Sequence, residues 1–120
     1  MIPKNELRTG NWVTKNFGAN IKLIEGSQID ESEHFLPIIL SDEVLLLCGF
    51  SFNDYFKLWQ KARKLPQAGT ELEMDMAYNV RDFGYRYIGV KLTSLHQLQN
   101  LFFMLKGSEM EMTSFEANNI

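Results

Sequence analysis

The chain has 120 residues, 45% of them hydrophobic, and a formal net charge of −3. This length suits one domain with a packed core, and the small acidic surplus argues against a general binder of nucleic acid. Cys48 is the single cysteine, which excludes an internal disulfide. The chain begins without an apolar signal segment, and its apolar runs are too short for a membrane span, so we expect a cytoplasmic protein.

The first forty residues predict a hairpin and a further strand. Residues 12–14 and 21–25 are rich in strand-forming side chains and flank a loop that contains glycine, as in an antiparallel hairpin. Residues 35–40 are apolar and predict a short strand, with Pro37 suited to a sheet edge. These elements would form the first part of a small sheet.

A helix should begin after Ser41, whose hydroxyl can cap it, and end at Cys48. The next segment, residues 51–65, fits two structures. Its aromatic residues have helical spacing before a stop at Pro66, but residues 55–60 could instead form a strand. The helix is the favoured interpretation.

Residues 70–80 alternate between apolar and acidic side chains, which predicts a strand with one buried face. A turn at residues 81–84 would return the chain as an antiparallel partner over residues 85–92. The residues expected to face inward are Leu72, Met74, Met76, Tyr78 and Val80.

A second capped helix follows over residues 94–107, with Ser94 as its cap and Gly107 at its exit. Residues 109–112 alternate as a short last strand would. The expected fold class is α+β: a small single domain over residues 1–112, with antiparallel strands and two to three helices packed on one side. Residues 113–120 should be a frayed tail. The apolar stripe of the second helix consists of Leu95, Leu98, Phe102 and Leu105.

Three blocks of the sequence are distinctive: NELRTGNWV at residues 5–13, PIILSDEVLLLCGF at residues 37–50, and HQLQNLFF at residues 96–103 with Gly107 and Glu109. These blocks resemble a family of small uncharacterised proteins of anaerobic gut bacteria and their phages or mobile elements. They cover about a third of the chain and occur in the same order. The resemblance implies a shared α+β fold and a bacterial or phage setting, and it implies no catalytic residue.

Residues able to perform catalysis are few. Cys48 and His96 could form a nucleophilic pair, but a cysteine at the end of an apolar helix is usually buried and inert. His34 lies beside acidic residues without the spacing of a metal site, so a solvated loop is the favoured interpretation. The acidic residues of 71–75 suit a solvated strand face. We therefore expect no catalytic residue, metal or cofactor, and favour a protein that is not an enzyme.

The polar residues of the second helix have two interpretations. Gln99 and Asn100 lie away from the apolar stripe and should face solvent. His96 lies next to the stripe, where it could orient the packing or contact a ligand.

The clearest sign of binding is a basic segment at residues 57–64, with four cations and no acidic residue. As a helix it would present a basic face to an anionic partner, or it could be neutralised by the acidic strand at residues 71–75. A smaller aromatic and basic cluster near Phe17 adds a second surface. The candidate binding residues are Phe17, Lys57, Trp59, Lys61, Arg63 and Lys64.

Three functions remain open from the sequence, and the least favoured is a small hydrolase or other enzyme, which would need an ordered pocket lined by His96, Cys48 or clustered carboxylates. The favoured one is a non-enzymatic interaction or accessory protein, associated with a phage or mobile element, whose partner is another protein or a second copy of itself. The alternative is a nucleic-acid-binding module that uses the segment Lys57 to Lys64. Binding to nucleic acid that weakens steeply as the salt concentration rises would distinguish this alternative from the favoured function.

Overall fold

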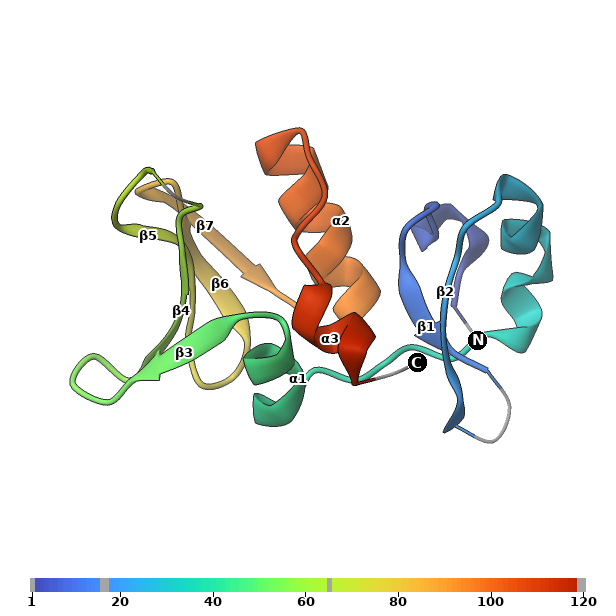
Figure 1. Ribbon diagram of the computed structural model, residues 1–120, viewed down its shortest axis with the longest axis horizontal. Helices are drawn as coiled ribbons and strands as arrows, with labels where there is room; N and C mark the ends of the chain where they lie inside the picture. Colours follow the sequence, from blue (N-terminus) through green and yellow to red (C-terminus); the bar gives the residue numbers. More distant parts are fainter. Residues whose placement is uncertain (1, 16–17, 65, 119–120) are drawn as a thin grey trace. The chain divides into compact units, whose positions relative to one another are not determined.

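The computed structural model describes residues 2–15, 18–64 and 66–118. Its contacts divide the chain into two compact units (Figure 1). Unit 1 consists of Met1–Ile39 and Thr93–Met110, and unit 2 consists of Leu40–Leu92 and Glu111–Ile120. Helices and two antiparallel sheets make up the described part of the chain, so the α+β class predicted from the sequence is correct.

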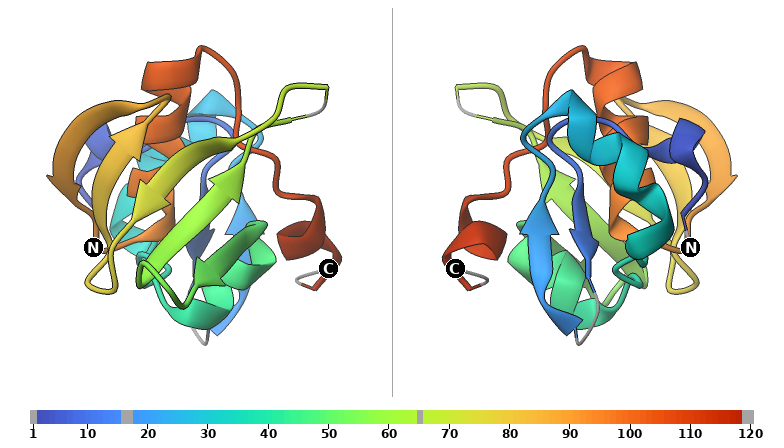
Figure 2. Two further views of the ribbon diagram at one scale, coloured as in Figure 1. Left: turned by 90° about the vertical axis from the view of Figure 1, so that its left-hand side faces the viewer. Right: turned by 90° about the vertical axis from the view of Figure 1, so that its right-hand side faces the viewer.

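Unit 1 contains the predicted hairpin, in which β1 (Trp12–Thr14) pairs antiparallel with β2 (Asn20–Lys22). A short 3-10 turn, η1 (Lys4–Glu6), precedes the hairpin, and a longer 3-10 segment, η3 (Gly26–His34), follows it (Figure 2, right). Residues 35–40 form only isolated bridges rather than the expected strand. The hydrophobic cluster of this unit contains Ile2, Leu7, Val13, Leu23 and Phe35.

The long helix α2 (Leu95–Lys106) also belongs to unit 1, and its ends follow the predicted signals. Gly107 has a left-handed φ of 80°, and its N–H donates to the Phe103 carbonyl, as expected for a glycine after a helix. The prediction for Ser94 is half right. Ser94 is the N-cap residue, but its hydroxyl does not bond to the helix backbone. Of the predicted stripe, Leu95, Leu98 and Phe102 are buried and Leu105 is half-buried.

Unit 2 is built on a five-stranded antiparallel sheet in which each strand pairs with the next along the chain (Figure 2, left). This order requires only short connections, because each strand returns beside the one before it. The strands are β3 (Phe50–Asn53), β4 (Leu58–Ala62), β5 (Thr70–Met74), β6 (Asn79–Phe83) and β7 (Arg86–Lys91).

The helix predicted over residues 51–65 is wrong, because β3 and β4 form a hairpin there. The side-chain oxygen of Asn53 accepts hydrogen bonds from the N–H groups of Tyr55 and Phe56, which turns the chain. Lys57 has a positive φ of 56° and completes the reversal. Spacing could not decide between the two structures, since aromatic residues suit both a helix face and a strand.

The strand predicted over residues 70–80 is divided by a second tight turn between β5 and β6. The Asp75 carboxylate accepts hydrogen bonds from the backbone N–H groups of Ala77 and Asn79, and this closes the turn. Met76 therefore lies on the loop and is exposed, contrary to the expected inward direction. The turn predicted at residues 81–84 lies later, at Gly84 and Tyr85, which both have positive φ.

Two short helices complete unit 2. The predicted helix α1 (Asp42–Leu47) is confirmed, and the Ser41 hydroxyl accepts a hydrogen bond from the Val44 N–H at 3.2 Å. The helix α3 (Thr113–Ala117) contacts α1 and occupies a region predicted to fray. Phe115 is buried in α3, which explains why this segment is ordered as a helix. The strand predicted at residues 109–112 does not form.

Among the described residues, no helix has the length and apolar content needed to cross a membrane.

Candidate functional site

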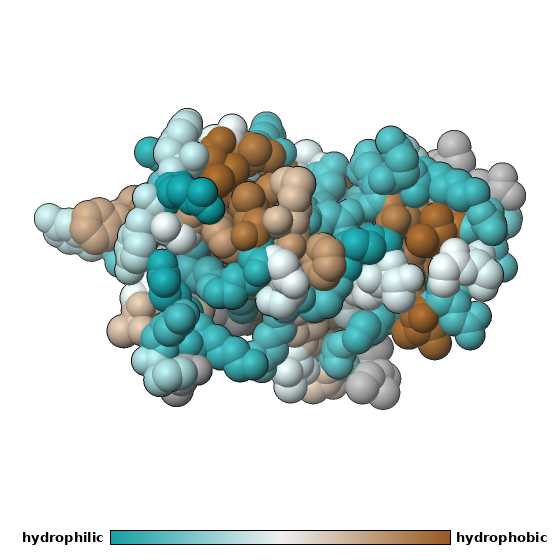
Figure 3. Space-filling view, turned by 90° about the horizontal axis from the view of Figure 1, so that it is seen from above, coloured by the Kyte–Doolittle hydropathy of each residue, from teal (hydrophilic) through white to brown (hydrophobic). Residues whose placement is uncertain are grey.

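Several large apolar side chains of unit 2 remain exposed. Leu46 on α1 is 57% exposed and Met76 on the β5–β6 turn is 64% exposed. Tyr55 and Phe56 are also exposed, at the tip of the β3–β4 hairpin, where their rings meet edge to face. On the face drawn in Figure 3, brown apolar side chains reach the surface among teal hydrophilic ones. Apolar side chains grouped on a surface are typical of a binding site.

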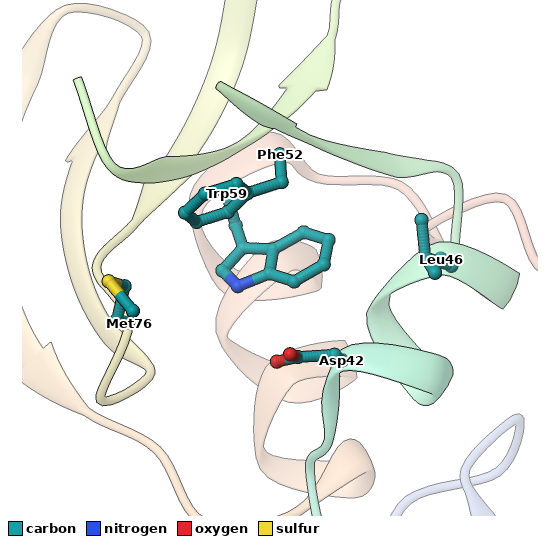
Figure 4. Close-up of a pocket in the computed structure, with 5 residues that line it drawn as sticks. All are labelled: Asp42, Leu46, Phe52, Trp59 and Met76. Atoms are coloured by element: carbon teal, nitrogen blue, oxygen red, sulfur yellow. The ribbon is translucent and has the colours of Figure 1, made fainter. Parts of the chain in front are cut away.

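Two of these exposed residues line a cavity of about 390 Å³ in unit 2 (Figure 4). Helix α1 contributes one wall, the β3–β4 hairpin contributes the aromatic wall, and the turn after β5 contributes the third side. This volume lies at the lower end of the range of small-ligand sites and suits a long side chain. We call this cavity the unit 2 pocket, and its lining residues are Asp42, Leu46, Phe52, Trp59 and Met76.

The aromatic wall is fixed by strand pairing. Phe52 on β3 lies directly opposite Trp59 on β4. Their ring centroids are 5.1 Å apart and the ring planes meet at 62°, an edge-to-face arrangement. Trp59 is only 5% exposed, so its ring is held in place, and part of its side chain lines the cavity. In Figure 4 the indole nitrogen lies on the edge of the ring that faces Asp42 and Met76.

A hydrogen bond orients the charged group of the pocket. The Tyr78 hydroxyl donates to Oδ1 of Asp42 at 2.7 Å. Burial raises the pKa of Tyr78 to about 12, and the hydrogen bond and negative charge of Asp42 act in the same direction. Tyr78 therefore keeps its proton at neutral pH and remains a donor. Among the residues that the structure describes, none forms an ion pair with Asp42.

The basic segment proposed from the sequence is distributed differently, because it is a strand and a turn rather than a helix. Lys57 lies at the turn, 3.6 Å from the Asp54 carboxylate. The Arg63 guanidinium lies over the Tyr85 ring at 4.8 Å. Lys64 is exposed. Phe17 lies outside the described residues.

Lys61, the remaining cation of this segment, is partly buried. Its Nζ donates to the Cys48 carbonyl at 2.7 Å and lies 5.7 Å from the centre of the Phe50 ring. Burial lowers the pKa of Lys61, and the neighbouring groups Cys48, Glu111 and Glu71 act against that shift. This contact explains how a cation is held at the end of α1. Of the five candidate residues that the structure describes, only Trp59 lines the unit 2 pocket.

A second concentration of polar residues lies in unit 1, where the sequence predicted a solvent face. Gln99 is 1% exposed, and its side-chain amide pairs with the backbone. Its oxygen accepts from the Trp12 N–H at 2.8 Å, and its nitrogen donates to the Gly10 carbonyl at 2.9 Å. The expectation that Gln99 faces solvent is therefore wrong. A helical pattern records only which side of the helix a residue occupies, and here the N-terminal segment covers that side.

Asn100 extends this network. Its nitrogen donates to the Glu6 carbonyl, and its oxygen accepts from the Asn11 side chain and from Nε of Arg8. Arg8 also pairs with Glu109. The first and last blocks that carry the family resemblance therefore contact each other. This network satisfies polar groups of unit 1 and attaches the N-terminal segment to α2.

His96 joins the same network through both ring nitrogens. Nε2 lies 3.0 Å from the Glu6 carboxylate, and Nδ1 lies 3.2 Å from the Ser94 hydroxyl. Serine, histidine and glutamate in one chain are the residue types of nucleophilic catalysis. A cavity of about 200 Å³ borders all three, but Ser94 is 1% exposed. We assign these contacts to the attachment of η1 to α2, in agreement with the orienting role considered for His96.

Cys48 is buried at the end of α1, and burial raises its pKa to about 12 despite the opposing charge of Lys61. Such a thiol is a poor nucleophile at neutral pH. Within the described ranges, no group of three or more metal-ligating side chains lies together.

No protein-family model, curated protein or solved structure matches this chain.

Proposed function

We propose that this chain is a non-enzymatic interaction protein that holds another protein at the unit 2 pocket. The setting we propose for it is bacterial, phage or mobile-element, on the resemblance of its three sequence blocks. The observation that supports the binding function is the pocket itself. It joins an aromatic pair held by strand pairing to two apolar side chains that remain exposed. Aromatic residues and methionine in such pockets are typical centres of protein interfaces.

A random peptide library tests this function, because it samples many side-chain combinations and does not depend on one chosen partner. Peptides selected on the parent protein should bind Leu46→Ser and Met76→Ser at least about tenfold more weakly, because each change removes a large apolar side chain from the contact. Both side chains are exposed, so neither variant should unfold. Ile24→Ser is the matched control, since Ile24 is similarly exposed and belongs to unit 1.

Two results would contradict the proposal. One is a library in which no selected peptide distinguishes the parent from the Leu46→Ser, Met76→Ser double variant. The other is a parent dimer, seen by sedimentation, that the same double variant converts to monomer, since this would assign the pocket to a second copy of the chain.

The nucleic-acid alternative has its own measurement. Binding to mixed-sequence DNA or RNA should weaken steeply as salt rises if phosphates are the ligand. The contacts of Lys57, Lys61 and Arg63 within unit 2 give this alternative less support than an exposed basic helix would.

A further inference from the structure

The unit 2 pocket combines a carboxylate with apolar and aromatic walls. Asp42 is the one charged residue among the five described lining residues. In the part of the chain that the structure describes, no cation forms an ion pair with Asp42. A neutral apolar occupant would remove water from this carboxylate without replacing its hydrogen bonds, which is unfavourable. The occupant that fits best is therefore long, apolar along its stem and positive at its end.

We propose that the unit 2 pocket binds an arginine side chain of the partner protein. This inference rests on the proposed function and names the chemistry that the site recognises. The apolar stem of the arginine packs against Leu46 and Met76, which line opposite sides of the cavity (Figure 4). Arginine and lysine both bury their stems in this way while the charged end remains hydrogen-bonded.

The aromatic wall favours a cation at the inner end. Tryptophan is the strongest aromatic partner for a positive charge, and a guanidinium also stacks on the ring. The Trp59 ring is already held by its edge-to-face contact with Phe52, so little ordering is needed when the cation arrives.

The carboxylate selects arginine over lysine. The Tyr78 hydroxyl occupies one site on Oδ1 of Asp42 and orients the group. The remaining acceptor positions can take two N–H groups from a planar guanidinium, whereas an ammonium acts as a single point charge. Arginine can therefore bond to Asp42 and stack on Trp59 in one position, which lysine cannot do.

The indole N–H signal of Trp59 in a nitrogen–proton NMR spectrum reports on this site directly. The chain has two tryptophans, and Trp12 belongs to unit 1, so its indole signal is an internal control. The probes are the peptides acetyl-Ala-Arg-Ala-amide and acetyl-Ala-citrulline-Ala-amide. Citrulline has the shape of arginine without its charge, and a lysine peptide completes the set.

We expect the arginine peptide to shift the Trp59 signal and leave the Trp12 signal unchanged. The citrulline peptide should bind about tenfold more weakly, as expected for the loss of one charge-assisted contact. Asp42→Asn should weaken the arginine peptide by a similar factor and reduce the preference for arginine over citrulline. Asp54→Asn is the matched control, because Asp54 is an exposed carboxylate of the same unit that does not line the pocket.

Failure of this inference differs from failure of the proposed function. If library peptides require Leu46 and Met76 but arginine and citrulline peptides bind equally, the arginine assignment is wrong and the interaction function stands. Binding of the arginine peptide that is unchanged in Asp42→Asn would also overturn the assignment. If no library peptide and no arginine peptide responds to any pocket variant, both proposals are wrong.

Discussion

The two units differ in the kind of side chain that lies in an environment unusual for it. In unit 1, polar residues of α2 are buried, and Gln99, Asn100 and His96 each bond to the N-terminal segment. In unit 2, apolar residues such as Leu46 and Met76 are exposed beside an oriented carboxylate. Burying a polar group is favourable only when it is paired, and exposing an apolar group does not stabilise the fold.

This difference separates polar residues that stabilise the fold from a surface that is available for binding. The network of unit 1 contains serine, histidine and glutamate, which are residue types of nucleophilic catalysis. These side chains nevertheless bond to one another within the unit. The pocket of unit 2 contains few residues of chemical interest, yet its surface is left available. A paired polar cluster therefore indicates stability, and an uncovered apolar pocket indicates binding.

The largest effect should come from Lys61→Glu in unit 2. This change removes the donor to the Cys48 carbonyl and places a third carboxylate near Glu71 and Glu111. We expect a loss of about 3–5 kcal/mol in the free energy of unfolding, measured with urea. Lys64→Glu is the exposed control and should change stability by less than about 0.5 kcal/mol. Equal losses in the two variants would show that Lys61 is solvated.

In unit 1, Gln99→Ala should cost about 2–4 kcal/mol, because it removes the buried amide that bonds to the Trp12 N–H and the Gly10 carbonyl. Urea unfolding measures the loss. Gln97→Ala is the matched control, since Gln97 is only half-buried and accepts from the Thr93 backbone. A loss below about 0.5 kcal/mol in Gln99→Ala would mean that water or another group replaces the amide. Peptide binding at the unit 2 pocket should be unchanged.

A smaller effect concerns pH and the β5–β6 turn that carries Met76. Partial burial acts to raise the pKa of Asp75, but hydrogen bonds from Asn79 and Ala77 outweigh it and lower the pKa. A carboxyl whose folded pKa is lowered stabilises the protein above its unfolded pKa of about 4, and this contribution is lost as the pH falls through the folded pKa. Asp75→Asn should therefore cost about 1 kcal/mol at neutral pH and progressively less in acid.

The measurement is the free energy of unfolding in urea for the parent and Asp75→Asn, from neutral pH down through the folded pKa of Asp75. Asp54→Asn is the exposed control. A difference that is constant with pH would show that the charge of Asp75 does not contribute.

The smallest effect concerns Ser94, where we expect no covalent labelling. A fluorophosphonate reagent should leave this serine unmodified in the native protein, because its hydroxyl is buried against His96. Mass spectrometry of the treated protein provides the measurement. Labelling of the parent that disappears in Ser94→Ala would reverse the assignment and make the Ser94–His96–Glu6 chain a catalytic site.

Among its described residues, the candidate site predicted from the sequence shares one with the unit 2 pocket. Trp59 is predicted as part of a basic helix, and it lines the pocket as part of a strand. Phe52, Leu46, Asp42 and Met76 are not among the predicted binding residues, because each resembles a residue of an ordinary helix or strand. Asp42 follows a capping serine and Met76 continues an alternating pattern, so neither shows a local sign of binding.

The sequence alone predicts the elements whose ends are marked by nearby residues, such as a helix cap or a turn glycine. The cap at Ser41 and the turn at Gly107 depend on a few neighbouring residues, and both helix ends lie where the sequence predicts them. The tertiary structure decided which faces are covered. Gln99 is buried because the N-terminal segment lies on it, and Met76 is exposed because Asp75 turns the chain. Burial depends on distant segments, and periodicity along one element contains no information about them.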